Sequence, residues 1–311
     1  MNSLDRYKDL RISRNLLNEV KRRYSVTADV LSYRRCSRLY ASQAERGFSP
    51  AQPSQRYVGQ VIHQVLDRAH LHYSGRLSKA TAGKIPNDDQ IRVYFNEVDG
   101  ALRAHGIRPF NNELGEYVLR LLQKFNRIEG NQLYPRVKDT EHKLQSDRGS
   151  YILHGVVDVL VSPMASNGNS EEIWDYKGSR RPKDTPKFGN KILQDYKFQM
   201  LVYSSLFKLR NGYYPSKGVI YFVGELGDKN VSSRPNSAML EVPLDDKEME
   251  KALMSFEDTV HQIENSRITN NWSPPTDGAE TAGRETCDAC DLRFSCIYEQ
   301  GNYKHRLPLR V

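Results

Sequence analysis

The sequence has few cysteines, few hydrophobic residues and no long hydrophobic run, and each of these features excludes some classes of protein. No apolar stretch approaches the roughly 20 residues that a membrane-spanning helix needs. The first 24 residues are charged throughout and lack the apolar core of a secretory signal peptide. Hydrophobic residues make up only 38% of the chain, which fits a heavily charged surface. These absences predict a cytoplasmic protein without a membrane segment.

The four cysteines are unevenly distributed. Cys287, Cys290 and Cys296 stand close together, whereas Cys36 lies about 250 residues earlier. In a reducing cytoplasm this pattern favours a metal site over disulfides. Four thiolates suit a [4Fe–4S] cluster or a tetrahedral zinc ion, and a single Cys-x2-Cys pair fits the cluster better. Unmetallated structural cysteines are the remaining alternative.

Basic residues exceed acidic ones, and the net charge is +8. This excess fits a polyanionic partner, most simply nucleic acid, although general solubility is the alternative. One stretch broken by proline and glycine carries five cations that would contact a phosphate backbone without reading bases. These residues are Arg180, Arg181, Lys183, Lys187 and Lys191. The alternative for this stretch is a solvated loop.

Hydrophobic periodicity predicts a mixed α/β chain. We expect a basic helix in residues 1–26, a single domain in residues 27–298 with an inserted helical subdomain at about 77–135, and a tail in residues 299–311. Thr27 can cap a second helix. Strands are expected at 140–144, 151–161, 173–177, 218–223 and 238–242, and helices at 57–73, 192–209 and 245–264. The strands at 151–161 and 173–177 would form a hairpin with a long loop.

Acidic residues lie in both strands of this expected hairpin. Strand side chains alternate, so Asp175 and Lys177 share one face while Trp174 and Tyr176 share the other. Asp158 lies in a strongly apolar strand, where an unpartnered charge is costly to bury. Two such aspartates could bind Mg²⁺ or Mn²⁺. A surface ion pair between Asp175 and Lys177 is the alternative.

Polar residues on two expected helices extend this set. Gln199 and Tyr203 are four residues apart and so share a helix face. His63 follows Gly59 by four residues on its own helix. Taken alone, His63 fits a structural histidine, and Gln199 and Tyr203 fit an ordinary amphipathic helix.

Four motifs occur in order inside the cysteine frame: Gly59-x3-His63, Gly155-x2-Asp158, Asp175-Tyr176-Lys177 and Gln199-x3-Tyr203. In this order they resemble the RecB-type branch of the PD-(D/E)XK nuclease superfamily. The cysteine frame resembles the iron–sulfur subset of that branch, which includes the AddB nuclease domain and the CRISPR-associated adaptation exonucleases. The resemblance covers roughly residues 27–298. One departure is Cys36-Ser37, where many relatives have Cys-Pro.

The resemblance implies a restriction-endonuclease-like core, which is a mixed central sheet flanked by helices. It also implies that His63, Asp158, Asp175 and the carbonyl of Tyr176 hold the divalent metal, with Lys177 as the catalytic lysine.

Three further residues receive roles from the resemblance. Gln199 and Tyr203 would shape the substrate side of the site, and Glu141 occupies the place of an additional acidic residue on the first strand. The four cysteines would hold a structural [4Fe–4S] cluster, with zinc as the alternative.

These features lead to three hypotheses about function. The first is a Mg²⁺- or Mn²⁺-dependent DNA nuclease acting on ends or single strands, in DNA repair, CRISPR adaptation or phage defence. Because the chain has no Gly-x4-Gly-Lys-Ser/Thr motif, a separate helicase subunit would supply any unwinding. The second is a non-catalytic DNA-binding scaffold of a helicase–nuclease complex. The third is a zinc-stabilised nucleic-acid adaptor.

Overall fold

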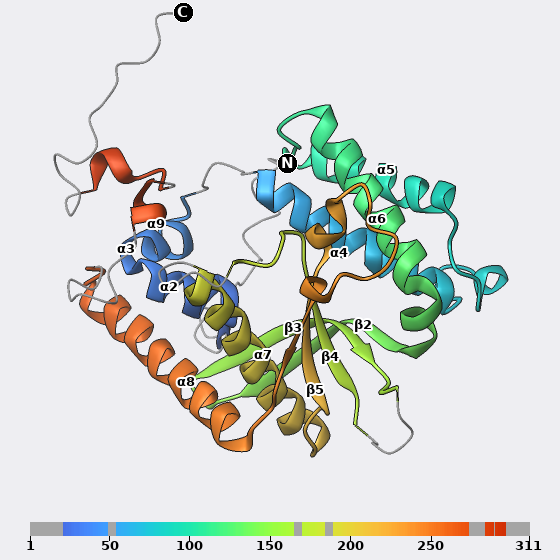
Figure 1. Cartoon of the computed structure of the whole chain (residues 1–311). Helices are drawn as coiled ribbons and strands as arrows, with labels where there is room; N and C mark the ends of the chain where they lie inside the picture. The colour runs from blue at the N-terminus through green and yellow to red at the C-terminus, as the bar shows by residue number, and fades with distance from the viewer. Residues whose placement is uncertain are drawn as a thin grey trace, which may run out of the picture.

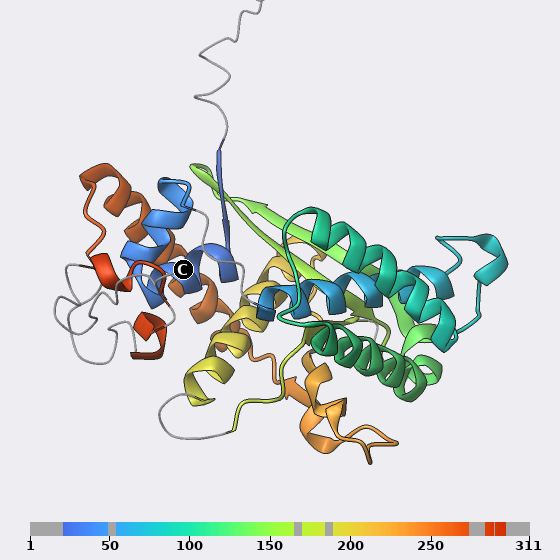
Figure 2. The same ribbon diagram turned by 90° about the horizontal axis from the view of Figure 1, so that it is seen from above.

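The computed structural model describes residues 21–48, 54–164, 170–183, 189–273, 284–288 and 290–296. These residues form a six-stranded mixed sheet with helices on both faces (Figures 1 and 2). The strands are β1 (Arg22–Ser25), β2 (Val137–Asp147), β3 (Tyr151–Val161), β4 (Glu172–Lys177), β5 (Lys217–Phe222) and β6 (Met239–Val242). The long helices are α4 (Ser54–Tyr73), α5 (Asp88–Ala104), α6 (Asn112–Leu133), α7 (Gly189–Asn211) and α8 (Asp246–Thr269). Short helices are α2 (Ser32–Arg35), α3 (Ser37–Tyr40) and α9 (Arg284–Asp288).

Strand β3 organises the sheet. It pairs antiparallel with β2 along its length, parallel with β1 through residues 151–154, and antiparallel with β4 through residues 159–161. Strand β4 then pairs parallel with β5, and β5 pairs antiparallel with the edge strand β6. This mixed sheet flanked by helices confirms the predicted fold class.

Two hydrophobic cores lie on opposite faces of the sheet. Trp174 and Tyr176 pack with α4, α5 and α6, whereas Ile173 packs with α7 and α8. The predicted alternation along β4 is therefore confirmed, and it places Asp175 and Lys177 on the α7 face.

The residues near the N-terminus differ from the sequence prediction. Arg22–Ser25 form strand β1 and join the sheet, so a helix extending to residue 26 is wrong for these residues. Ser25, and not Thr27, caps the helical turn that follows, because the Ser25 hydroxyl accepts a hydrogen bond from the Ala28 amide at 3.2 Å. Residues 1–20 and the tail 299–311 lie outside the described residues.

The stretch from 77 to 135 is largely helical, as predicted. Asn87 and Gln90 cap the N-terminus of α5 through a reciprocal pair of hydrogen bonds. The Asn111 side chain caps α6 by accepting a hydrogen bond from the Leu114 amide at 2.9 Å.

None of the helices in the described ranges combines the length and apolarity required to cross a bilayer.

A buried histidine supports β4 from the α4 side. His70 lies on α4, is 2% exposed, and has Nε2 3.1 Å from the Tyr176 hydroxyl. Burial lowers the pKa of His70 to about 3. Its role is structural, and the neutral ring is part of the packing that holds Tyr176 in place.

Because His70 is neutral in the folded protein, we expect acid to destabilise the fold. Between its ordinary pKa of about 6.5 and the folded value of about 3, the unfolded chain binds a proton that the folded chain does not. Stability from this group is therefore complete above about pH 6.5 and falls as the pH drops toward 3. Urea unfolding at about pH 7 and pH 4 should show that wild type loses roughly 3 kcal/mol more than His70→Gln.

The matched control for this measurement is His105→Gln, since His105 is exposed at the end of α5. Its pH dependence should match that of wild type. If His70→Gln also matched wild type, the ring would titrate as freely in the folded protein as in the unfolded chain.

Candidate active site

The two predicted aspartates lie where β3 and β4 separate. The pairing of these strands ends at Val159 and Trp174. Beyond that point the Tyr176 amide donates to Asp158 Oδ2 at 2.6 Å instead of to a backbone carbonyl. Asp158 is therefore held against the backbone between Asp175 and Lys177. The separation of the strands opens the sheet and leaves polar side chains facing one another.

A group of three potential metal ligands forms beside Asp158. His63 Nδ1 on α4 lies 3.1 Å from Asp158 Oδ1. Glu141 on β2 completes the group, since one ligand atom from each of the three residues lies within 4.8 Å of the others. Opposite ligands of one Mg²⁺ ion are roughly 4.2 Å apart, so the group is close to the size of a single-ion site.

Glu141 has an unusual backbone conformation. Its φ is +48°, in the left-handed region that side-chain-bearing residues rarely adopt. Such strain is most often found at functional sites. The sequence placed Glu141 as a possible additional acid, and the structure places it with His63 and Asp158, whereas Asp175 lies outside this closest group.

Asp175 belongs to a second, connected group. Lys177 Nζ lies 2.6 Å from Asp175 Oδ2, and the Gln199 amide donates to Asp175 Oδ1 at 3.0 Å. Gln199 Oε1 in turn accepts a hydrogen bond from Lys177 Nζ at 3.2 Å. Within the part of the chain that the structure describes, the buried Asp175 Oδ2 accepts no well-aligned hydrogen bond despite the nearby ammonium group. It therefore retains capacity for a further cation.

The pKa values show that the two groups interact. Burial would lower the pKa of His63, but the Asp158 and Asp175 carboxylates raise it to about 9. Burial and Asp158 raise the pKa of Asp175, which Lys177 opposes. Burial would lower the pKa of Lys177, but the Asp175 and Asp158 carboxylates raise it, so the side chain stays an ammonium. Both groups therefore form one electrostatic unit.

Helix α7 contributes three residues to this unit. Besides Gln199, it supplies Tyr203, whose pKa burial raises to about 12, and Tyr196, whose ring lies 4.7 Å from Lys177 Nζ. Gly155 makes room for Tyr203, because a Cβ at Gly155 would lie 2.5 Å from a ring carbon of that tyrosine. Tyr196 was not predicted from the sequence, although its position three residues before Gln199 places it on the same helix face.

The predicted basic loop is only partly described. Arg180 is exposed and pairs with Asp228, the Arg181 amide donates to Glu225 at 2.8 Å, and Lys183 is exposed. Lys191 is exposed at the start of α7, while Lys187 lies outside the described residues. Arg180, Arg181 and Lys183 therefore follow shortly after Lys177 along the chain.

The cysteines of the second predicted site come from the two ends of the chain. Cys36 breaks the helical path between α2 and α3 with an extended backbone. Burial raises the pKa of Cys290, and repulsion from Cys36 and Cys296 adds to this effect. These thiols are thus close enough to interact electrostatically, which is an arrangement that a bound cation would stabilise. Figure 1 and Figure 2 show α9 beside α2 and α3.

Neighbouring contacts also join the two ends. The Ser37 hydroxyl donates to the Ser273 carbonyl at 2.8 Å, and the Trp272 ring packs against both Tyr33 and Tyr40. Trp272 and Ser273 therefore lie against the helices near Cys36.

A mixed sheet whose separating central strands present aspartates and a lysine, next to a histidine–carboxylate group, defines a nuclease-type α/β core. Residues 24–297 match the PD-(D/E)XK nuclease superfamily, and the chain belongs to this superfamily. Among solved structures, the chain is similar to a Eubacterium rectale protein named "Putative exonuclease", with a TM-score of 0.50 and 13% identity over 97% of this chain and 95% of that one. This similarity concerns the fold. A search of curated proteins finds no match.

Proposed function

We propose that the protein is a divalent-metal-dependent DNA nuclease that removes nucleotides from ends or single strands. The observation that carries this proposal is the convergence of His63, Glu141 and Asp158 within 4.8 Å, beside the buried pair of Asp175 and Lys177. Asp158 links the two groups through the Tyr176 amide. The donor set is oxygen-rich with one imidazole, which suits Mg²⁺ or Mn²⁺.

His63, Glu141 and Asp158 would hold the ion, with Asp175 and the Tyr176 carbonyl as the further ligands that the superfamily resemblance implies. A divalent ion supplies Lewis-acid stabilisation of a phosphate oxygen and lowers the pKa of an attacking water. The buried Asp175 Oδ2, which lacks a well-aligned donor among the described residues, supports a cation at this position. Burial, with repulsion from Asp158, raises the pKa of Asp175, so a divalent ion beside this carboxylate would offset the cost of its ionised form.

Lys177 would act through its charge. Its pKa is raised by neighbouring carboxylates, so Nζ carries its protons and does not serve as a general base. The ammonium can donate to the attacking water or to an oxygen that gains negative charge in the transition state. Gln199 bonds both Lys177 and Asp175 and would keep the two side chains aligned.

The cysteine site is proposed to hold a structural [4Fe–4S] cluster of the RecB-type iron–sulfur subset. One Cys-x2-Cys pair, a five-residue gap and a remote fourth cysteine favour the cluster, and zinc is the alternative to be tested.

Location and partners are also proposals. We propose a cytoplasmic enzyme that acts on DNA in repair, CRISPR adaptation or phage defence. A separate helicase subunit would provide unwinding where duplex DNA is the substrate.

The proposal predicts that linear DNA is degraded and that closed circles survive. Purified protein with Mn²⁺ or Mg²⁺ should shorten end-labelled linear single strands, whereas circular single strands should persist and EDTA should stop the reaction. Gel electrophoresis of linear single-stranded, linear duplex and circular substrates in parallel measures this preference.

Two other outcomes of this assay would change the proposed function. Equal cleavage of circles and linear strands would replace the exonuclease with an endonuclease. If no substrate were cut with either metal, the hydrolase would be abandoned in favour of a DNA-binding scaffold.

A further inference from the structure

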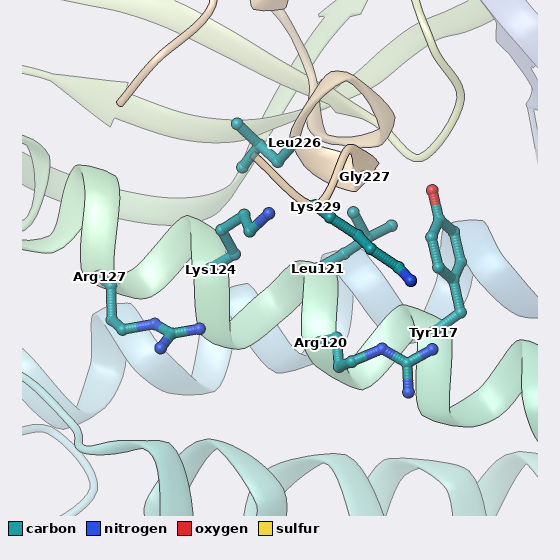
Figure 3. Close-up of a pocket in the computed structure, with 8 residues that line it drawn as sticks. All are labelled: Tyr117, Arg120, Leu121, Lys124, Arg127, Leu226, Gly227 and Lys229. Carbon is teal, nitrogen blue, oxygen red and sulfur yellow. The ribbon is translucent and has the colours of Figure 1, made fainter. Parts of the chain in front are cut away.

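A basic pocket lies between α6 and the segment that follows β5. Its volume is about 250 Å³. Four cations line it: Arg120, Lys124 and Arg127 from α6, and Lys229 from the facing segment. Figure 3 shows the α6 side chains on one side and Leu226, Gly227 and Lys229 on the other. The pocket contains no residue of the active site described above.

Three of these cations form a row on α6. Arg120, Lys124 and Arg127 are four and three residues apart, so they lie along one helix face, where like charges repel and weaken the helix slightly. Lys124 donates to the Asp228 carbonyl at 2.7 Å, and Arg127 lies 3.7 Å from an Asp88 carboxylate oxygen. Neither Arg120 nor Lys229 forms an ion pair with any described residue. These two cations are available to an anion.

The pocket combines this charge with apolar surface. Leu121 and Leu226 are buried beneath the cations, and the half-buried Tyr117 completes the lining. Gly227 permits the close approach of Tyr117, whose hydroxyl lies 2.2 Å from the position of a Cβ at residue 227. Cations around an aromatic and apolar floor are the combination that binds single-stranded nucleic acid, with phosphates on the charges and a base on the ring. The small volume suits one nucleotide and not a duplex.

Contacts connect this pocket to the active site. Phe222, the last residue of β5, pairs with Lys177 on β4. The segments that follow Lys177 and Phe222 stay side by side. A Cβ at Gly224 would lie 2.5 Å from the Ser179 backbone, and Arg180 pairs with Asp228. Arg180 also lies close enough to Tyr117 to interact electrostatically with it. Arg180 therefore connects the residues after Lys177 to the edge of the pocket.

We propose that this pocket binds a nucleotide of the single-stranded DNA substrate away from the cleaved bond, with Arg120 and Lys229 contacting its phosphates. The proposal rests on the DNA nuclease function and adds a second point of attachment for the strand. Holding the strand at two points would keep its end aligned with the active site and prolong residence on the enzyme.

The test measures binding separately from cleavage. The double variant Arg120→Ala/Lys229→Ala and the wild type are titrated with fluorescein-labelled oligothymidylate in EDTA, and fluorescence anisotropy is followed at several salt concentrations. We expect the variant to bind roughly tenfold more weakly at low salt. The slope of log Kd against log salt should fall by about 1.4, because each lost single-strand phosphate contact removes about 0.7.

The matched control is Lys247→Ala/Lys251→Ala, which removes the same charge from two exposed positions on α8. It should keep the salt slope and the nuclease activity of wild type. If the pocket variant and this control have the same slope while wild type binds and cuts DNA, the pocket proposal is overturned and the nuclease stands. If wild type neither binds nor cuts DNA, both proposals fail together.

Discussion

Replacing Asp175 with asparagine is expected to reduce DNA cleavage by roughly 10²–10³-fold, because losing a metal ligand weakens the electrostatic stabilisation that the bound ion supplies. The substitution keeps the size of the side chain but removes a charge that lies 2.6 Å from Lys177 Nζ and is held by Gln199. Affinity for Mn²⁺ should fall in parallel, because a neutral amide is a weaker ligand than a carboxylate. Cleavage of labelled single strands and calorimetric titration with Mn²⁺ measure the two effects.

The same variant should remain folded, which separates lost chemistry from lost structure. The metal-free site has three carboxylates, Glu141, Asp158 and Asp175, against two cations, His63 with a pKa of about 9 and Lys177. With asparagine at position 175, the negative and positive charges of the site are equal in number. With Lys177→Met, the carboxylates outnumber the remaining cation. We therefore expect Lys177→Met to melt at a lower temperature than Asp175→Asn, with Mn²⁺ partly restoring it.

The control is Asp195→Asn, one turn before Gln199 on α7. Asp195 interacts with Arg34, Arg35 and Lys191 instead of with the site. Its removal should leave cleavage close to wild type. Unchanged cleavage in Asp175→Asn itself would exclude this carboxylate from the reaction.

Much of this site could be predicted because it depends on local periodicity. Two-residue alternation placed Asp175 with Lys177 and away from Tyr176, and four-residue spacing placed Gln199 with Tyr203 on one face of α7. The strands and helices that carry these residues have strong apolar patterns. The expectation that these strands and helices meet at one site came from the order of the four motifs, and not from the individual residues.

The features that were missed depend on contacts between distant parts of the chain. Strand β1 has only four residues and pairs with β3 some 129 positions later, so its own sequence carries little strand signal. Glu141 is expected as an additional acid, but the sequence does not indicate the left-handed backbone through which it joins His63 and Asp158. The basic pocket joins Arg120 to Lys229, and no periodic pattern links residues on separate elements.

Loss of the cysteine site is expected to have the largest effect on stability. The link from Cys36 to the C-terminal trio closes a loop of about 250 residues, and removing such a link costs up to about 5 kcal/mol in chain-entropy models. For a chain of this size that corresponds to a fall in Tm of roughly 10 °C. We expect Cys36→Ser and Cys290→Ser each to lose the brown colour and bound iron of wild type and to melt at lower temperature. Visible absorption, metal analysis and thermal unfolding measure these losses.

The control is Ser295→Ala, next to Cys296, because the Ser295 hydroxyl donates to the nearby Leu292 carbonyl at 3.2 Å and forms no other hydrogen bond among the described residues. It should keep the iron and the melting temperature. Below their melting temperatures the cysteine variants should still cleave DNA, because their carboxylates and lysine are intact. Stoichiometric zinc in wild type would replace the cluster with a zinc site. An unchanged Tm in both cysteine variants would show that Ser37, Trp272 and their neighbours hold the two ends together without a metal.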